Sequence, residues 1–152
     1  MVSFEGLDKI TLLEIADSVT HIGKDAFKGC EKLILLGDVL YHGPRNDLPE
    51  EYNPKGVIAL LNEMSEEILA VRGNCEAEVD EMVLDFNVLA EYALLYVKSR
   101  LIFLTHGHKF NPQNMPKLKK GDILFNGHTH VSKIEMINNI LYVNALISSK
   151  FY

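Results

Sequence analysis

Four short polar motifs constrain this chain most, because each lies beside a glycine and follows a stretch that reads as a β-strand. In order they are Leu36-Gly37-Asp38, Gly73-Asn74, Thr105-His106-Gly107-His108 and Gly127-His128-Thr129-His130. Oxygen and imidazole ligands placed repeatedly at strand ends are what a divalent-metal site on an α/β scaffold requires. Because no sulfur is needed, the set suits Mn, Fe or Zn better than a structural zinc held by thiolates.

The length and composition favour one globular domain. The chain has 152 residues, of which 47% are hydrophobic and 24% are charged, and this is ordinary for a domain with a sizeable core. The formal net charge is −6. An acidic surface does not attract a phosphate backbone over a wide face, so we expect no extended nucleic-acid surface.

The cysteine count and the hydrophobic pattern indicate a cytoplasmic chain. Cys30 and Cys75 are the two cysteines and form no C-x-x-C motif, which fits a reducing compartment better than a disulfide framework. No apolar run approaches the roughly 18 residues of a membrane span, and no signal peptide is evident. We expect no membrane attachment and leave open whether the chain forms a homo-oligomer.

Strands alternate with helices or turns along residues 32–152. The apolar spacing predicts helices over 54–64 and 79–82. It predicts strands over 33–36, 68–71, 83–89, 92–97, 101–105, 122–125, 133–136 and 140–143. Asn138 and Asn139 between the last two strands predict a tight hairpin turn.

The segment 7–36 has a different texture from the rest. Residues 10–15 favour a strand, Asp17 and Ser18 indicate a turn, and residues 23–28 favour a short helix. The pattern resembles one leucine-rich repeat of the bacterial surface-protein type. A single repeat cannot bury its apolar face alone. We therefore expect this segment to pack on the remainder of the chain and not to form an independent domain.

The polar motifs, in their order, resemble those of the calcineurin-like metallophosphoesterase superfamily, and within it the small bacterial phosphodiesterases of the YfcE type. The resemblance rests on residues 37–46 with Leu48-Pro49-Glu50, on residues 71–75 and on the two histidine motifs. It implies a four-layer α/β/β/α sandwich over residues 32–152, with metals at the carboxyl ends of the strands. It also implies hydrolysis of a small phosphodiester.

The resemblance implies a ligand role for five residues. Asp38 would bridge two metals, Asn74, His106 and His128 would complete the set of one metal, and His130 would serve the other. Two bridged cations lower the pKa of a shared water, which then attacks phosphorus. Manganese is the expected metal, with Fe, Ni and Zn as alternatives.

The same resemblance points to residues that act on the substrate. Asn74 and His108 are the candidate catalytic residues, since a donor near the phosphate assists the transition state. For His108, a solvent-exposed position is an equal alternative. Arg45 and Asn46 resemble a substrate-contacting loop, and arginine can bind a phosphate oxygen pair. Glu76 is assigned no role.

Both ends of the sequence depart from the family pattern. The family begins with Asp-x-His-Gly, but no Asp-x-His precedes Asp38. Asp17 and His21 are either a displaced substitute or, as we favour, a turn and a surface position of the repeat-like segment. Asn144 and Ala145 begin a sequence that replaces the usual Asn-Pro-Gly-Ser. We expect a sandwich truncated at both ends.

The lack of the Asp-x-His motif predicts weak binding of one metal and low activity. One divalent ion should bind well and the second poorly, because the number of ligands sets metal affinity. We therefore expect a metal-dependent phosphodiesterase of weakened activity. The alternative is a catalytically inactive module that keeps a partial metal site and has a binding or scaffold role.

Overall fold

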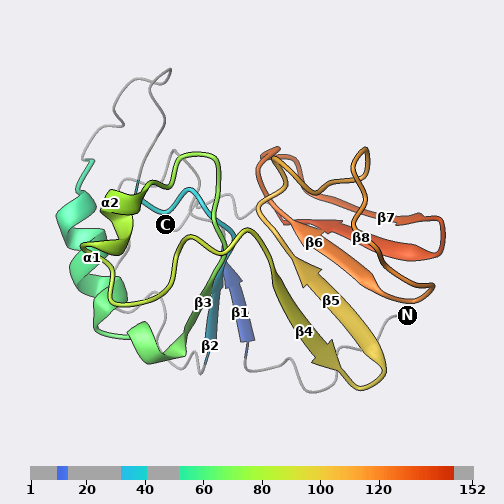
Figure 1. Cartoon of the computed structure of the whole chain (residues 1–152), viewed down its shortest axis with the longest axis horizontal. Coiled ribbons are helices and arrows are strands. Elements are labelled where there is room, and N and C mark those ends of the chain that lie inside the picture. Colours follow the sequence, from blue (N-terminus) through green and yellow to red (C-terminus); the bar gives the residue numbers. More distant parts are fainter. Residues whose placement is uncertain (1–9, 14–31, 41–51, 146–152) are drawn as a thin grey trace.

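Two β-sheets form the centre of the molecule. The computed structural model describes residues 10–13, 32–40 and 52–145 (Figure 1). The first sheet is parallel, in the order β1-β2-β3, and consists of β1 (Ile10–Leu13), β2 (Lys32–Leu35) and β3 (Ile68–Ala70). The second sheet, in the order β4-β5-β6-β8-β7, consists of β4 (Ala93–Val97), β5 (Arg100–Leu104), β6 (Ile123–Asn126), β7 (Lys133–Ile137) and β8 (Ile140–Asn144). Its three central strands are parallel and its two edge strands are antiparallel to their neighbours.

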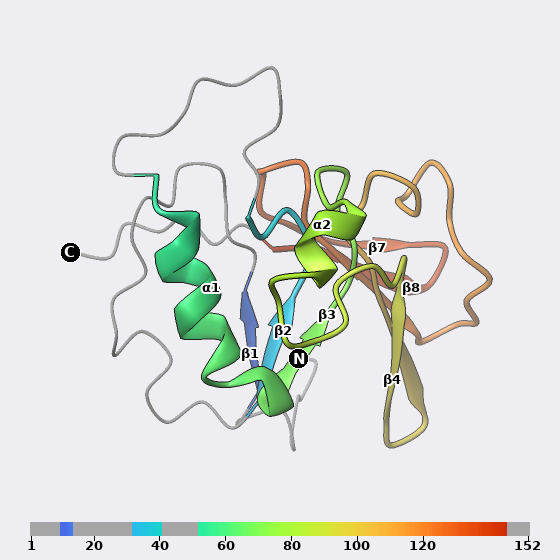
Figure 2. The ribbon, with the colours of Figure 1, turned by 60° about the vertical axis from the view of Figure 1, so that its left-hand side comes forward.

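The described helices lie on the outer side of the first sheet (Figure 2). They are α1 (Pro54–Asn62), the 3₁₀ turn η1 (Ser65–Glu67) and α2 (Glu78–Glu81). Helix α1 begins with a proline, and the side chain of Asn53 accepts a hydrogen bond of 3.0 Å from the Gly56 N–H. Both features favour a helix start, because the first turn has unpaired N–H groups. None of these helices has the length and hydrophobicity of a transmembrane span.

Strand β2 is buried on both faces, as a central parallel strand should be. Leu33 and Leu35 pack toward α1 and contact Leu61. The alternate residues Ile34 and Leu36 pack toward the second sheet, because successive side chains of a strand point to opposite faces. Full burial of such a side chain contributes about 1.5–3 kcal/mol. Strand β2 thus holds α1 and the second sheet on opposite sides of the first.

A loop covers the outer face of the second sheet. Phe110, Met115 and Leu118 from this loop pack against buried residues that include Phe103 and Leu124. In residues 105–121 the structure has turns and bends instead of a helix. The predicted α/β sandwich is confirmed. In the described part of the chain, this loop covers the face of the second sheet that points away from the first sheet.

Most predicted elements are present, with ends shifted by one or two residues. Asn138 and Asn139 have φ values of 52° and 63°, the left-handed values that a tight type I′ hairpin turn requires. Only residues 10–13 and 32–36 of the repeat-like segment are described, and β1 pairs with β2 in the first sheet. The rest of that pattern, including Asp17 and His21, lies outside the described residues.

The strand predicted over 83–89 is wrong, because this stretch has turns and irregular backbone. The side chain of Asn62 makes hydrogen bonds to this backbone that a neighbouring strand would otherwise make. Its amide group donates to the Val83 carbonyl at 2.9 Å, and its carbonyl oxygen accepts from the Asp85 N–H at 3.0 Å. Leu84 and Val88 are buried, so the apolar pattern marks anchoring residues of a loop.

Candidate metal centre

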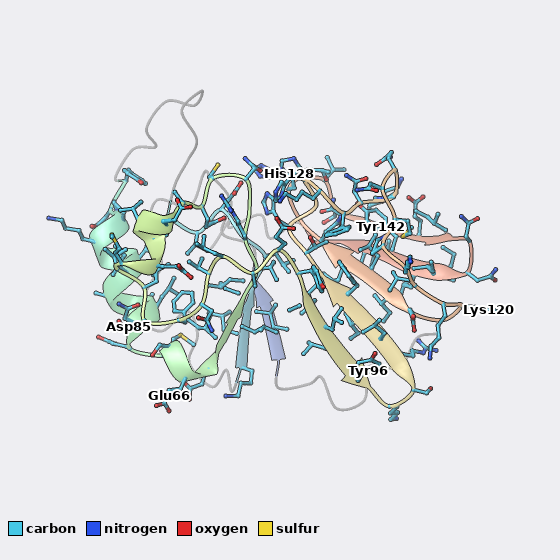
Figure 3. All side chains as sticks on the ribbon, in the orientation of Figure 1. Glu66, Asp85, Tyr96, Lys120, His128 and Tyr142 are labelled. Carbon is cyan, nitrogen blue, oxygen red and sulfur yellow. The ribbon has the colours of Figure 1, made fainter. Side chains whose placement is uncertain are left out.

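The candidate metal ligands follow strands whose carboxyl ends meet at one edge of the two sheets. Asp38, His106 and His128 come shortly after β2, β5 and β6, respectively. Each offers one ligand atom, and these atoms all lie within 4.8 Å of one another. Figure 3 places His128 where the ends of the two sheets come together. The tertiary structure therefore joins three of the sequence motifs.

His106 is fully buried and its orientation is fixed by the backbone. Its Nδ1 lies 2.6 Å from the carbonyl oxygen of Leu36. A carbonyl oxygen only accepts, so Nδ1 carries a proton, and in the neutral ring Nε2 presents a lone pair. A backbone acceptor that fixes the imidazole in this way is the usual support of a metal-binding histidine.

Several acceptor atoms surround this lone pair. The Nε2 atom of His106 lies 3.0 Å from Asn74 Oδ1 and 3.3 Å from Asp38 Oδ2. It also lies 3.0 Å from His128 Nδ1. Amide and carboxylate oxygens and an imidazole lone pair repel one another unless a cation or protons lie between them. Two imidazoles, a carboxylate and an amide oxygen form a donor set that fits a divalent metal.

Asp38 is ionised at neutral pH despite its partial burial. Burial by itself raises the pKa of Asp38, but a hydrogen bond from His106 and the charge of that ring, both present when His106 is protonated at both nitrogens, outweigh it, and the Cys75 N–H adds to their effect. The net pKa therefore lies below its ordinary value. The Cys75 N–H donates to Asp38 Oδ1 at 3.0 Å, so the carboxylate is both charged and oriented.

The two glycines of the first motifs allow the Asp38 and Asn74 loops to touch. Gly37 has a φ of 94°, and a Cβ on it would lie 2.4 Å from Gly73 N. A Cβ on Gly73 would lie 2.1 Å from Asp38 Oδ1. Side chains at either position would push the loops apart, so glycine is required at both for close approach, and at Gly37 also for its left-handed φ.

Glu76 is a residue of this centre that the sequence interpretation missed. It is 3% exposed, and its Oε1 and Oε2 accept hydrogen bonds from Val39 N–H at 2.6 Å and Gly73 N–H at 2.5 Å. The carboxylate thus ties the Asp38 loop to the Asn74 loop. Burial raises the pKa of Glu76, with a contribution from the charge of Asp38, above its ordinary value. Its signal in the sequence is an acidic residue directly after a ligand motif.

His108 lies at the border of the cluster. It is half-buried, and its ring centroid is 5.4 Å from that of His106. Burial lowers the pKa of His108, and the nearby His106 and His128 lower it further, so the ring is neutral at pH 7. Its Nδ1 is buried and has no hydrogen-bond partner among the described residues. The catalytic role of His108 stays a prediction.

His130 does not join the group of three ligand residues. His128 has a φ of 69° and His130 a φ of 54°, and the Thr129 N–H donates to the Gly127 carbonyl at 2.8 Å. The chain turns here, and His128 joins the cluster while His130 does not, although both side chains are exposed. Arg45 and Asn46 lie outside the described residues.

Comparison with known proteins identifies the family. The family model described as the calcineurin-like phosphoesterase superfamily domain matches residues 15–145. The chain belongs to the calcineurin-like phosphoesterase superfamily. A divalent metal agrees with both this superfamily and the donor set at Asp38, His106 and His128.

Two comparisons single out one similar member of the calcineurin-like phosphoesterases. Phosphodiesterase YfcE of Escherichia coli (strain K12) is 46% identical over 119 residues, which are 78% of this chain and 65% of that protein. The chain thus spans slightly less than two thirds of the length of this relative. A solved structure of Yfce, a phosphoesterase from E. coli, superimposes with a TM-score of 0.78 at 41% identity, over 88% of this chain and 77% of that one.

More distant calcineurin-like structures share the fold. A novel archaeal phosphodiesterase has a TM-score of 0.55 at 20% identity, over 89% of this chain and 81% of that one. Vps29 of Chaetomium thermophilum has a TM-score of 0.55 at 14% identity, over 89% of this chain and 70% of that one. At these identities the likeness establishes the architecture alone.

Proposed function

We propose that this chain is a metal-dependent phosphodiesterase that hydrolyses small phosphodiesters. The observation that carries this proposal is the convergence of Asp38 Oδ2, Asn74 Oδ1 and His128 Nδ1 on Nε2 of His106. The similarity to phosphodiesterase YfcE supports the same reaction. A substrate phosphate is an anion, and the metal centre is where an acidic protein can bind it.

The residues of the centre have separable tasks in this reaction. When bound, a divalent cation supplies positive charge for the phosphate oxygens and acidifies the water that attacks phosphorus. Asp38, Asn74, His106 and His128 hold it, and Asp38 is charged for this purpose at neutral pH. Glu76 keeps the two loops together. The cation therefore binds to a preorganised set of donors, which is what transition-state stabilisation requires.

His108 acts on the substrate in its neutral form. Its pKa is held below the ordinary value of 6.5, so at pH 7 the ring offers one N–H donor and no positive charge. It can donate this hydrogen to a phosphate oxygen as negative charge develops there. Arg45 and Asn46 are proposed to contact the substrate from the segment 41–51.

We further propose that one Mn²⁺ binds tightly and a second binds weakly, and that activity is correspondingly low. The position of His130 outside the ligand group supports this proposal, as does the lack of an Asp-x-His before Asp38. Fe, Ni and Zn are the alternatives for the same donors. Asp17 and His21 are the candidates for a displaced first motif.

The proposal also covers the domain organisation and the location of the chain. Residues 7–36 do not form an independent domain but pack on the metallophosphoesterase domain of residues 32–152, as the pairing of β1 with β2 supports. The absence of a C-x-x-C motif supports a reducing, cytoplasmic location.

Turnover of bis-p-nitrophenyl phosphate with added Mn²⁺ tests the proposed function. Replacement Asn74→Ala removes a ligand and a donor, so the rate should fall about 10²-fold. The matched control Asn87→Ala changes an exposed loop asparagine and should retain the rate. Equal rates for wild type and Asn74→Ala would refute the enzyme and favour the inactive module. Calorimetric titration with Mn²⁺ that gives two tight sites would refute the weak second site.

A further inference from the structure

A pocket lies directly beside the metal centre. Its volume is about 320 Å³, and it shares His108 and His128 with the centre. From there it extends to Asn126 and Asn144, the last residues of β6 and β8, which are register partners in the second sheet. This volume is at the small end of ligand pockets, which span roughly 300–1,000 Å³. A group attached to a phosphate at the metal centre would reach this pocket.

The pocket is lined by two buried amides that each have an acceptor to spare. Asn126 and Asn144 are 1% and 3% exposed, and neither Oδ1 has a hydrogen-bond partner among the described residues. A buried acceptor without a partner costs free energy, which a ligand donor would recover. The Asn126 amide group is oriented toward the Phe110 carbonyl, 3.4 Å away.

The second amide is oriented more firmly. Asn144 Nδ2 donates to Thr129 Oγ1 at 2.6 Å and to the Tyr142 hydroxyl oxygen at 3.1 Å. Because both hydrogens of this amide are used, its Oδ1 remains the free acceptor. The Tyr142 hydroxyl accepts from Asn144, which leaves its own hydrogen to donate to another group. The pocket therefore combines acceptors with a donor, a pattern that alcohol groups satisfy because each both donates and accepts.

The charges of the lining argue against a second anion in the pocket. Lys133 Nζ lies 2.7 Å from Glu135 Oε1, and both residues line the pocket. Their opposite charges cancel at its edge. Tyr142 is 4% exposed, so it offers no open ring face on which a nucleobase could stack. An uncharged, hydroxyl-bearing group fits these surroundings better than a phosphate or a base.

We propose that this pocket binds one ester alcohol of the phosphodiester, and that this alcohol is a small polyol such as glycerol or a pentose. The inference rests on the proposed function, because the phosphate must lie at the metal centre. The free hydroxyls of the polyol donate to the amide oxygens of Asn126 and Asn144. The pocket thus selects among phosphodiesters by the hydroxyl groups that their alcohols carry.

Two chromogenic substrates that differ only in hydroxyl groups test the proposal. They are the glyceryl and the n-propyl p-nitrophenyl phosphodiesters, and both release p-nitrophenol. With Mn²⁺, kcat/KM should be at least about 10-fold higher for the glyceryl ester, since a buried polar site discriminates against an analogue without its partner group. Calorimetric binding of glycerol 3-phosphate and n-propyl phosphate supplies a readout that needs no turnover, and the glycerol ester should bind more tightly.

A pair of variants separates the pocket from the catalytic machinery. Asn144→Leu removes the free acceptor and should reduce the preference for the glyceryl ester to less than about 3-fold, whatever its absolute rate. Asn87→Leu makes the same change at an exposed position outside the pocket and should keep the wild-type preference. The preference of the wild type stands as a test even if Asn144→Leu fails to fold.

The outcomes distinguish this inference from the proposed function. Hydrolysis of both esters by the wild type at equal kcat/KM, with equal binding of the two phosphates, overturns the polyol pocket and leaves the phosphodiesterase intact. A preference that Asn144→Leu retains in full overturns it as well. If the wild type with added metal hydrolyses neither ester and does not hydrolyse bis-p-nitrophenyl phosphate, both proposals are overturned.

Discussion

Replacement of Glu76 by alanine should damage both the stability of the chain and its metal centre. The carboxylate accepts the N–H groups of Val39 and Gly73, and these belong to the two loops that carry Asp38 and Asn74. Glu76→Ala leaves both N–H groups buried without their acceptor. The two loops then lose the direct link that this carboxylate provides.

The magnitude can be worked from the two hydrogen bonds. A buried donor that loses its partner costs about 1–3 kcal/mol, so two of them give about 2–6 kcal/mol. The raised pKa of Glu76 shows that its buried charge itself carries a cost, and the replacement removes that cost. We therefore expect a net loss near the lower end, about 2–3 kcal/mol of unfolding free energy.

Urea denaturation without metal measures the stability, and calorimetric titration with Mn²⁺ measures the affinity. We expect a lower denaturation midpoint for Glu76→Ala and Mn²⁺ affinity reduced at least about tenfold, which corresponds to about 1.4 kcal/mol. The matched control Glu78→Ala changes an exposed glutamate at the start of α2 and should stay within about 0.5 kcal/mol of wild type. Equal midpoints and affinities for the two variants would refute the reasoning.

Three further predictions test the same region. Gly73→Ala should weaken Mn²⁺ binding at least about 100-fold in calorimetry, since ligand geometry sets affinity and the new Cβ would lie 2.1 Å from Asp38 Oδ1. Gly121 has a left-handed φ of 90°, which Gly73 does not, but no atom lies within 4 Å of its Cβ. Gly121→Ala therefore adds a methyl group without a contact at the centre, so unchanged Mn²⁺ affinity is expected, and a matching loss would contradict the steric argument. In the folded chain the pKa of Glu76 is raised above its ordinary 4.5, so between pH 4.5 and that raised pKa the folded chain retains a proton that the unfolded chain has lost. The unfolding free energy of the metal-free wild type should therefore fall as the pH rises through this window, relative to that of Glu76→Gln. Parallel urea-denaturation curves for these two proteins across that window would contradict the sign. Leu36→Ala, at a position fully buried between the sheets, should lower the unfolding free energy by about 2–5 kcal/mol, and a loss below about 1 kcal/mol in urea would contradict its place in the core.

The local sequence pattern was sufficient to predict secondary structure where the spacing of apolar residues and the turn residues agreed. Asn138 and Asn139 indicated a hairpin, and their positive φ values confirm it. The pattern failed over 83–89, where Leu84 and Val88 are buried as in a strand but Asn62 bonds the backbone instead. A side chain more than twenty positions away cannot be inferred from the local sequence.

The same distinction holds at the site. The ligand motifs were recognisable because each type of donor follows a strand and lies beside a glycine. The sequence did not reveal that Glu76 links two loops or that the amide oxygens of Asn126 and Asn144 lack partners among the described residues. A carboxylate or an amide acquires such a role only from its neighbours in space.

The amino-acid sequence by itself indicated most of the order of strands and helices and the candidate metal donors, since both depend on residue types and their spacing. Only the tertiary structure decided which donors meet. Asp38, His106 and His128 converge because parallel strands end at one edge, whereas His130 lies outside the group after the turn at Gly127. The tautomer of His106 was likewise decided by the Leu36 carbonyl, a contact across seventy positions of chain that no local pattern contains.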